Sequence, residues 1–244
     1  MRYLLPFAAL ILLCSCRNTT SDGLTVQVEY VGALKNMMRK GDISAQIDLT
    51  ELSDQAGIYA LGAVTNLKGE VLILDSKPYI SYVQADSLLI DSTFDHTATL
   101  LVYSNIEQWQ EVQVPTDVKS ESSLEEYIEN KAEELGINVD APFPFRLIGT
   151  LTSMDWHVIN WKDGDLEHTH EKHVQSGLHD RMQGVEVDIL GFYSNRHHAI
   201  FTHHTTNMHM HVRTTDGQLV AHVDDLELGT GMKLLLPATK VAQD

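Results

Sequence analysis

One stretch near the C-terminus, residues 207–222, constrains the local fold of this chain more than any other. Polar and apolar side chains alternate through its first half, which is the period of a β-strand, and Asp216-Gly217 is a strong signal for a hairpin turn. Counting back from that turn along both strands places His211 directly opposite His222. His209 lies two residues from His211, so its side chain points to the same face. Three imidazoles are therefore predicted to converge on one patch of one hairpin.

Such a patch is the protein half of an open zinc site, in which three histidines bind the ion and a fourth position is left for water or substrate. The alternative is that these are packed or solvated histidines, because a His-x-His pair occurs by chance in many chains. Here the third imidazole, His222, is placed by the Asp216-Gly217 turn and not by the His-x-His pattern. This independent placement favours the metal site. We predict that His209, His211 and His222 bind a metal ion.

The other histidines are concentrated in the same region. Twelve of the thirteen lie between His157 and His222, and only His96 lies outside. The segment 168–173 reads HTHEKH and has three interpretations: a group around the metal ligands, a second metal site, or a solvated polar loop. The pairs at 197–198 and 203–204 leave the same alternatives open.

Length and charge limit the kind of protein. With 244 residues, of which 43% are apolar, the chain can bury a core as one large domain or two modest ones. Its formal net charge of −17 argues against nucleic acid as a partner, because binding to phosphates requires a basic face. The same charge argues against electrostatic docking on anionic lipid.

The first sixteen residues, MRYLLPFAALILLCSC, are predicted to be a targeting segment. Arg2 supplies the positive end, and the apolar run after it is too short to span a bilayer. The run ends in a sequence similar to a bacterial lipoprotein processing box, with Cys16 as the lipidated residue; an ordinary signal peptide or a short membrane anchor are the alternatives. We therefore expect an exported protein that touches the membrane only through a lipid anchor at Cys16. Both cysteines lie in this segment, which leaves none for a disulfide in the remainder.

After this segment, residues 17–25 are expected to form a tether. Two β-rich halves follow, an N-terminal mixed half at 26–140 and a C-terminal metal-binding half at 141–244, because prolines punctuate the chain near 142. The fold class is predicted as α+β or mixed α/β, with few helices and the metal site on the C-terminal antiparallel hairpin.

Two smaller elements bear on the site. Residues 122–137 form the clearest helix pattern, with a serine N-cap signal and Gly136 as its stop, and we interpret its glutamate-rich face as solvated. Glu70 begins a strand directly after a turn at Lys68-Gly69. From the residues alone, Glu70 is best interpreted as an edge carboxylate in water.

The hairpin histidines belong to a longer pattern. Gly191-Phe192 is followed by His209-Met-His211 and then by His222-Val-Asp224, and this order and spacing resemble the α-acetolactate decarboxylase family. The N-terminal half is similar more weakly, in the helix GALKNMMRKGD and the strand LGAVTNLKGEVLILDSKPY. Phe145-Arg146-x-x-Gly149-Thr150 resembles the family's central strand. The similarity covers most of residues 26–237.

This resemblance implies that His209, His211 and His222 hold Zn²⁺. The reaction it implies converts a small-molecule substrate, 2-acetolactate, into acetoin and carbon dioxide. It also implies catalytic roles for Glu70, as the acid beside the substrate, and for Arg146. A homodimer is implied by the resemblance only.

Two departures from the family pattern leave alternatives open. Where the family has a second arginine that acts on the substrate, counting without gaps finds His157, which could replace part of that role if protonated. The family also has a glutamate near its C-terminus, whereas this chain has none after Glu227. The alternative functions are an exported zinc-binding lipoprotein that sequesters or delivers the metal, and a metallo-lyase for another small hydroxy-keto acid.

Overall fold

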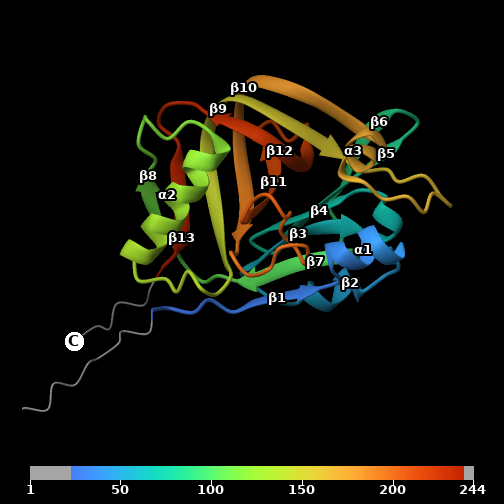
Figure 1. Cartoon of the computed structure of the whole chain (residues 1–244), viewed down its shortest axis with the longest axis horizontal. Helices are drawn as coiled ribbons and strands as arrows, with labels where there is room; N and C mark the ends of the chain where they lie inside the picture. Colours follow the sequence, from blue (N-terminus) through green and yellow to red (C-terminus); the bar gives the residue numbers. More distant parts are fainter. Residues whose placement is uncertain (1–22, 239–244) are drawn as a thin grey trace, which may run out of the picture.

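The fold is seen in a computed structural model that describes residues 23–238 (Figure 1). The predicted targeting segment, with Cys16, lies outside the described residues. Two antiparallel sheets and three α-helices make up the described chain. The predicted α+β or mixed α/β class, β-rich with few helices, is confirmed: the described chain is mostly β, with a histidine cluster near its C-terminal strands. No helix in residues 23–238 is long and apolar enough to cross a membrane.

The first sheet has the strand order β1-β7-β3-β4-β5-β6, and β2 pairs with β7. Helix α1 (Leu34–Lys40) follows the first of these strands and ends at Gly41 in the left-handed conformation. Two short 3-10 turns, at Leu49–Leu52 and Thr65–Leu67, connect neighbouring strands. The strands are β1 (Val28–Val31), β2 (Ile47–Asp48), β3 (Ile58–Val64), β4 (Glu70–Leu74), β5 (Lys77–Gln84), β6 (Ser87–Asp91) and β7 (Thr97–Asn105).

The second sheet has the order β10-β11-β12-β9-β13-β8, and β9 also pairs with β10, so four of its strands close on themselves. The strands are β8 (Trp109–Gln113), β9 (Phe143–Val158), β10 (Leu178–Tyr193), β11 (Met208–Thr214), β12 (Val220–Leu228) and β13 (Lys233–Pro237). Strand β8 and helix α2 (Glu121–Glu134) precede residue 140, yet β8 pairs with β13 and α2 contacts β12. The division into halves at residue 140 stays a prediction.

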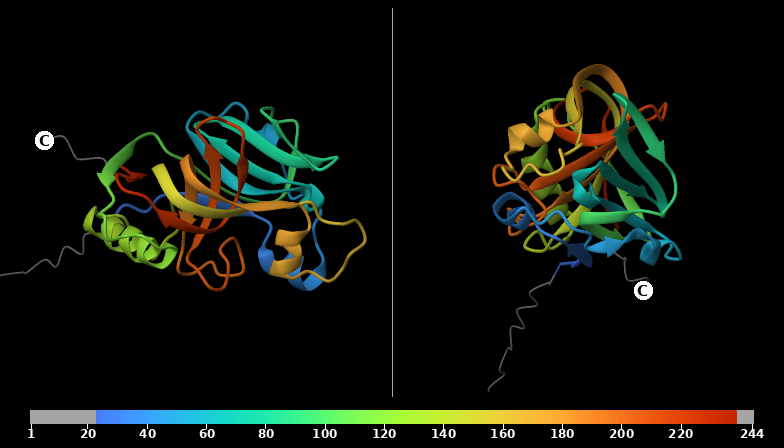
Figure 2. Two further views of the ribbon diagram at one scale, coloured as in Figure 1. Left: turned by 90° about the horizontal axis from the view of Figure 1, so that it is seen from above. Right: turned by 90° about the vertical axis from the view of Figure 1, so that its right-hand side faces the viewer.

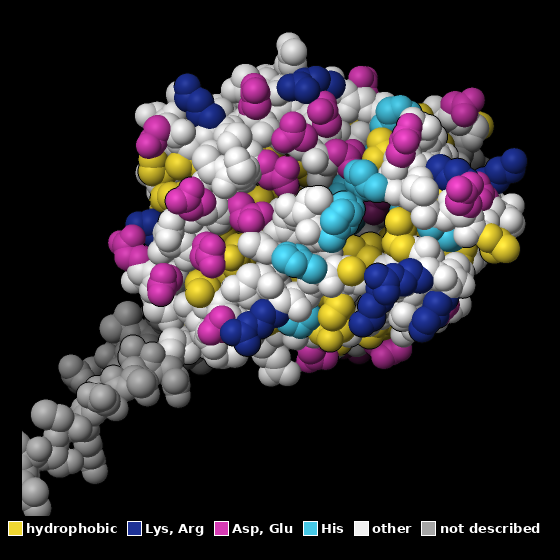
Figure 3. All heavy atoms as spheres, viewed as in Figure 1, with side chains coloured by type: hydrophobic (Ala, Val, Ile, Leu, Met, Phe, Trp, Pro, Cys, Tyr) yellow, Lys and Arg dark blue, Asp and Glu magenta, His cyan; other side chains and the backbone are white. Residues whose placement is uncertain are grey.

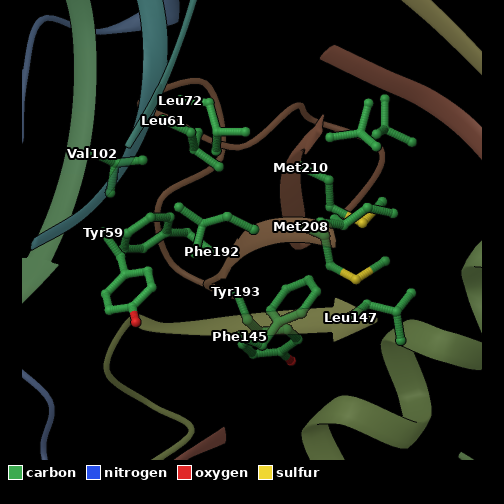
Figure 4. Packing of buried hydrophobic residues seen from close by; sticks show 14 of the residues in the cluster. Tyr59, Leu61, Leu72, Val102, Phe145, Leu147, Phe192, Tyr193, Met208 and Met210 are labelled. Atoms are coloured by element: carbon green, nitrogen blue, oxygen red, sulfur yellow. The ribbon is translucent and has the colours of Figure 1, made fainter. Parts of the chain in front are cut away.

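The long strands β9 and β10 pair along most of their length and extend from the second sheet over the first (Figures 1 and 2). Both sheets contribute to one hydrophobic core. It contains Leu61 and Leu72 from the first sheet and Phe192 from the second (Figure 4). All three side chains are fully buried. Burial of this apolar surface holds the two sheets together. It thereby fixes the positions of the polar side chains that lie between the sheets.

Local signals set several element ends. The helix predicted over residues 122–137 is α2. The side chain of Ser120 caps it, and its side chains Leu124 and Ile128 are buried. Residues 162–181, which include the HTHEKH segment, contain helix α3 (His170–Gln175), capped by the Thr169 side chain, and the start of β10. The interpretation of that segment as a polar loop is therefore wrong in part. Six mostly polar residues after a threonine cap form a short helix that apolar periodicity does not reveal.

Gly191 leaves room for an aromatic ring between β9 and β10. It lies opposite Phe145, and a Cβ added at Gly191 would lie 2.2 Å from Cζ of Phe145, which is fully buried. We expect Gly191→Ala to lower the free energy of unfolding by about 1–3 kcal/mol, the usual cost of overpacking a core. Urea denaturation measures this, and adding Phe145→Leu to the same chain should recover part of the loss. An unchanged midpoint in the single variant would contradict this packing.

Candidate metal centre

The predicted histidine hairpin consists of β11 and β12. His211 pairs with His222 and Val212 with Ala221, so the register predicted from the turn is confirmed. The connection between these strands spans residues 215–219 and is wider than a two-residue turn. Asp216 holds it, because its carboxylate accepts hydrogen bonds from Thr214 Oγ1 at 2.6 Å and from the backbone N–H of Gln218 at 3.0 Å.

His209, His211 and His222 meet on one face of this hairpin. Their ring centroids are 5.1 Å (His209–His211), 5.1 Å (His209–His222) and 5.3 Å (His211–His222) apart. One nitrogen from each ring can be chosen so that all three lie within 4.8 Å of one another. Three imidazole nitrogens at this spacing can become ligands of one ion after small rotations of the rings.

Hydrogen bonding orients the buried imidazole of His211. Its Nδ1 donates to the carbonyl oxygen of Val71 at 2.9 Å, which leaves Nε2 unprotonated in the neutral ring. This Nε2 and Nδ1 of His209 are buried and have no hydrogen-bond partner among the described residues. A buried nitrogen without a partner is costly, and a metal ion would satisfy both atoms.

Burial also keeps the three rings neutral. It lowers the pKa of His209 to about 4 and lowers the pKa values of His211 and His222 well below the ordinary value for histidine. Neutral imidazoles have the free lone pair that metal binding requires. A set of imidazole donors suits zinc and several other transition metals, so the residues fit a metal ion without identifying it.

Glu70, from the first sheet, lies beside the three histidines. It begins β4, which β12 contacts, and it is 4% exposed, so the interpretation as an edge carboxylate in water is wrong. Its Oε2 lies 3.6 Å from His211 Nε2, and its Oε1 accepts the backbone N–H of Ile159 at 3.0 Å. Burial raises the pKa of the Glu70 carboxyl to about 7, although the charge of His157 and the Ile159 hydrogen bond oppose this.

His157 lies on β9 opposite His222 and is 6% exposed. Its Nδ1 is 2.9 and 2.8 Å from the two carboxylate oxygens of Asp224. Burial by itself lowers the pKa of His157, but the hydrogen bond with Asp224 and the charges of Glu70 and Asp224 outweigh it, so the pKa lies above its ordinary value. His157 is therefore the ring in this group that most readily carries a positive charge.

Arg146 lies elsewhere. Its Nε and Nη2 donate to the two carboxylate oxygens of Asp188 at 3.2 and 2.6 Å, and its guanidinium lies over the ring of Tyr59 at 5.7 Å. It is not among the residues that line the cavity. The structure therefore brings together five of the six predicted site residues and places Arg146 apart from them, and its catalytic role stays a prediction.

The imidazoles open into a cavity of about 420 Å³ between the two sheets. Figure 3 shows histidine side chains gathered beside a hollow on this face, with hydrophobic side chains on its other side. His211 lies behind its wall, fully buried. No lysine or arginine among the described residues lines it. Its histidines are His157, His170, His173, His203, His209 and His222. Its acidic residues are Glu70, Glu121, Glu125 and Asp224.

Sequence reasoning missed the two glutamates from α2. The helix face that carries them was interpreted as solvated, whereas both line the cavity. Burial raises the pKa of Glu121 to about 7, reinforced by Asp225 and Glu125. The spacing of four residues places Glu121 and Glu125 on one helix face, but nothing in that spacing reveals what the face contacts.

The HTHEKH segment is partly buried at the cavity mouth. His168 stacks on Trp161 with ring centroids 4.4 Å apart, and its Nδ1 lies 3.0 Å from His173 Nε2. His170 and His203 have ring centroids 5.1 Å apart, and both line the cavity. In the described part of the chain, these rings form no group of three converging ligand atoms.

Glu125 fixes the start of β11. Its carboxylate accepts hydrogen bonds from Thr206 Oγ1 at 2.6 Å and from the backbone N–H and side-chain amide of Asn207, both at 2.9 Å. We expect Glu125→Ala to cost about 1–3 kcal/mol of stability and to speed amide hydrogen exchange at residues 206–209. The exposed neighbour Glu126, replaced in the same way, serves as the control. Equal exchange in both variants would contradict this anchoring.

Comparison with known proteins adds to this geometry. A family model described as "Alpha-acetolactate decarboxylase" matches residues 28–242. The comparison with curated proteins finds no match.

Three solved structures share the fold. A protein of unknown function similar to alpha-acetolactate decarboxylase, from Staphylococcus aureus, is 16% identical with a TM-score of 0.68. Alpha-acetolactate decarboxylase from Bacillus subtilis strain 168 is 13% identical with a TM-score of 0.68. Acetolactate decarboxylase from Bacillus subtilis subspecies spizizenii is 13% identical with a TM-score of 0.70. Each match covers 87% of this chain and 86% of the other. At these identities the likeness concerns the fold alone.

Proposed function

Because this chain belongs to the alpha-acetolactate decarboxylase family, we propose that it is a zinc-dependent carbon–carbon lyase that converts 2-acetolactate into acetoin and carbon dioxide. The observation that carries the proposal is the meeting of three neutral imidazoles, from β11 and β12, with the buried carboxyl of Glu70 at the wall of one cavity. The cavity volume of about 420 Å³ suits a substrate of a few carbon atoms.

His209, His211 and His222 would hold the zinc ion. When bound, the ion supplies a Lewis acid that stabilises the negative charge on the substrate oxygens as carbon dioxide leaves. The donor set of neutral histidines with unpartnered nitrogens supports this assignment.

The chain's own residues would handle the proton. The bond between the carboxyl carbon and the carbinol carbon breaks, and its electron pair stays on the substrate. Glu70, whose burial raises its pKa to about 7, holds a proton near neutral pH and delivers it to the carbon that has lost the carboxyl group. His157, held by Asp224 at Nδ1, would orient the substrate carboxylate by its positive charge.

The test measures acetoin formed from racemic 2-acetolactate by the full-length protein, with and without a chelator. A protein-free control is needed, because a β-keto acid also loses carbon dioxide slowly without a catalyst. We expect acetoin formation that the chelator abolishes and added Zn²⁺ restores. Absence of acetoin from protein that holds a full complement of zinc would refute the decarboxylation.

Two other functions remain as alternatives. Additional histidines line the same cavity and no lysine or arginine of the described chain does so, which favours an exported zinc-binding lipoprotein that sequesters or delivers the metal. The identity of only 13–16% to the solved structures is compatible with a metallo-lyase for another small hydroxy-keto acid on the same scaffold. Zinc transfer to a competing chelator, and assay of related hydroxy-keto acids, separate these from the main proposal. Export with a lipid at Cys16 stays part of the proposal.

A further inference from the structure

Two imidazoles lie side by side at the mouth of the cavity, apart from the histidine triad. His170 begins helix α3, and His203 lies in the connection between β10 and β11, so two separate segments of the chain bring them together. Both residues line the cavity, and their ring centroids are 5.1 Å apart. His203 is half-buried, whereas His170 is exposed and can meet an ion that arrives from solvent.

The spacing of these two rings is that of two ligands of one ion. When two histidines bind one zinc ion tetrahedrally, each nitrogen lies about 2.0–2.1 Å from the metal, which places the ring centroids roughly 5 Å apart. The pairs within the triad, with centroids 5.1 and 5.3 Å apart, have the same spacing. Small rotations of the rings therefore suffice at the mouth, as they do at the triad.

The neighbouring histidines do not offer such a pair. His168 and His173 share a hydrogen bond, because Nδ1 of His168 lies 3.0 Å from Nε2 of His173. The ring of His204 lies beside that of His203 with centroids only 4.1 Å apart, which is too close for both rings to point at one ion. Among the described residues no third ligand atom joins His170 and His203 in a group within 4.8 Å. The pair therefore provides two protein ligands, and water would complete the coordination.

Hydrogen bonding leaves a nitrogen of His203 free to bind. Its Nδ1 lies 2.8 Å from Oγ1 of Thr205, so Nδ1 can donate to this hydroxyl and leave the lone pair of Nε2 available. Burial lowers the pKa of His203, and the charges of His204 and His170 lower it further, so the neutral ring that a metal ion requires is favoured.

The surroundings attract cations and lead inward. Four acidic residues line the cavity, and no lysine or arginine of the described chain does so. A cavity lined by one sign of charge raises the local concentration of ions of the opposite sign. His209 and His222 line the same cavity, so an ion held between His170 and His203 lies in the space that opens onto the triad.

We propose that His170 and His203 form a capture site for a divalent transition metal ion, from which the ion passes to the triad by exchange of ligands. This inference rests on the metal site of the proposed function and describes how that site is filled. The two imidazoles replace water molecules of the hydrated ion, and the imidazoles of the triad then replace them. Two protein ligands hold an ion more weakly than three, so the ion moves inward and the resting protein keeps one ion, at the triad. Imidazole donors suit zinc, copper and nickel.

The first experiment titrates the metal-free, full-length protein with Zn²⁺ in competition with a chromogenic chelator. We expect one tightly bound ion and, at excess zinc, a second ion that is bound more weakly. His170→Ala/His203→Ala should lose only the weaker ion, whereas His211→Ala should lose only the tight one. The control His96→Ala/His179→Ala removes two histidines that do not line the cavity and should keep both ions. Thermal melts establish that each variant folds, and His170→Ala alone, at an exposed position, tests the same loss if the double variant does not.

The second experiment follows the uptake of zinc by the metal-free protein in a stopped-flow instrument with a fluorescent zinc indicator. At limiting zinc, loading of the triad in His170→Ala/His203→Ala should be slower by about tenfold or more, because capture makes the transfer to the triad intramolecular. The final occupancy of the triad should be unchanged. Absence of a weaker ion in the unaltered protein, or its survival in the double variant, would overturn the proposal. An unchanged loading rate would also overturn it and would mark the weaker ion as an adventitious ion only.

These outcomes are distinguishable from failure of the proposed function, because neither experiment measures acetoin. A protein that loads zinc through the capture site but forms no acetoin would refute the lyase and support this inference. A protein that forms acetoin but loads equally fast without His170 and His203 would leave the lyase intact and refute the capture site.

Discussion

Replacing His211 with alanine is expected to weaken zinc binding by at least about 100-fold and to abolish any metal-dependent activity. Removing a partner of a ligand typically costs 10–100-fold in metal affinity, and losing a ligand itself costs more. His211 has the largest effect of the triad because its ring is fully buried and oriented by Val71, so no water or neighbouring side chain replaces it readily. Competition with a chromogenic zinc chelator measures the affinity.

His204→Ala is the matched control, because His204 is an exposed histidine shortly before the same strand. Since His211→Ala also leaves the Val71 carbonyl without its partner, it should cost about 1–3 kcal/mol of stability. His209→Ala, whose unpartnered Nδ1 is the other candidate donor, tests the same site without that loss. Full zinc affinity in a folded His211→Ala variant would show that the hairpin does not hold the metal.

The second large effect is expected at Glu70. Glu70→Gln keeps the shape of the side chain and an oxygen for the Ile159 N–H, but it removes the proton that the proposed reaction requires. We expect the rate of acetoin formation to fall by about 10²- to 10⁴-fold, the range for loss of a general acid. The triad should still bind zinc, which separates this loss from that of His211→Ala.

The thermal stability of Glu70→Gln provides an independent test. Burial raises the pKa of Glu70, so ionising this carboxyl costs the folded state more than the unfolded state. The neutral amide removes that cost, and the melting temperature of Glu70→Gln at neutral or higher pH should be equal to or above that of the unaltered protein. Glu51→Gln, on an exposed turn, is the control. A normal reaction rate in Glu70→Gln would exclude Glu70 as the acid.

His157 has a defined place beside the histidine triad. Strand pairing places it opposite His222, and Asp224 holds its Nδ1. The hydrogen bond with Asp224 and the charges of Glu70 and Asp224 keep the pKa of His157 above its ordinary value. The region that the family pattern assigns to an arginine thus contains a side chain that can carry a positive charge.

Part of this protein follows from the sequence alone. The alternation of residues 207–213 and the Asp216-Gly217 turn determine that His211 pairs with His222, because strand period and turn chemistry act over a few residues. A serine-capped helix over residues 122–137 follows in the same way, and the structure has α2 at Glu121–Glu134 with Ser120 as its cap.

Only the tertiary structure decided what meets the hairpin. Glu70 looks like an edge carboxylate because its own strand carries no sign that β12 will pack against it. The glutamates of α2 look solvated for the same reason, and Arg146 shows no sign that Asp188 will bind it. Periodicity reports which side of an element is buried, but which elements then face one another depends on the packing of two whole sheets, and that packing brings the carboxylates to the imidazoles.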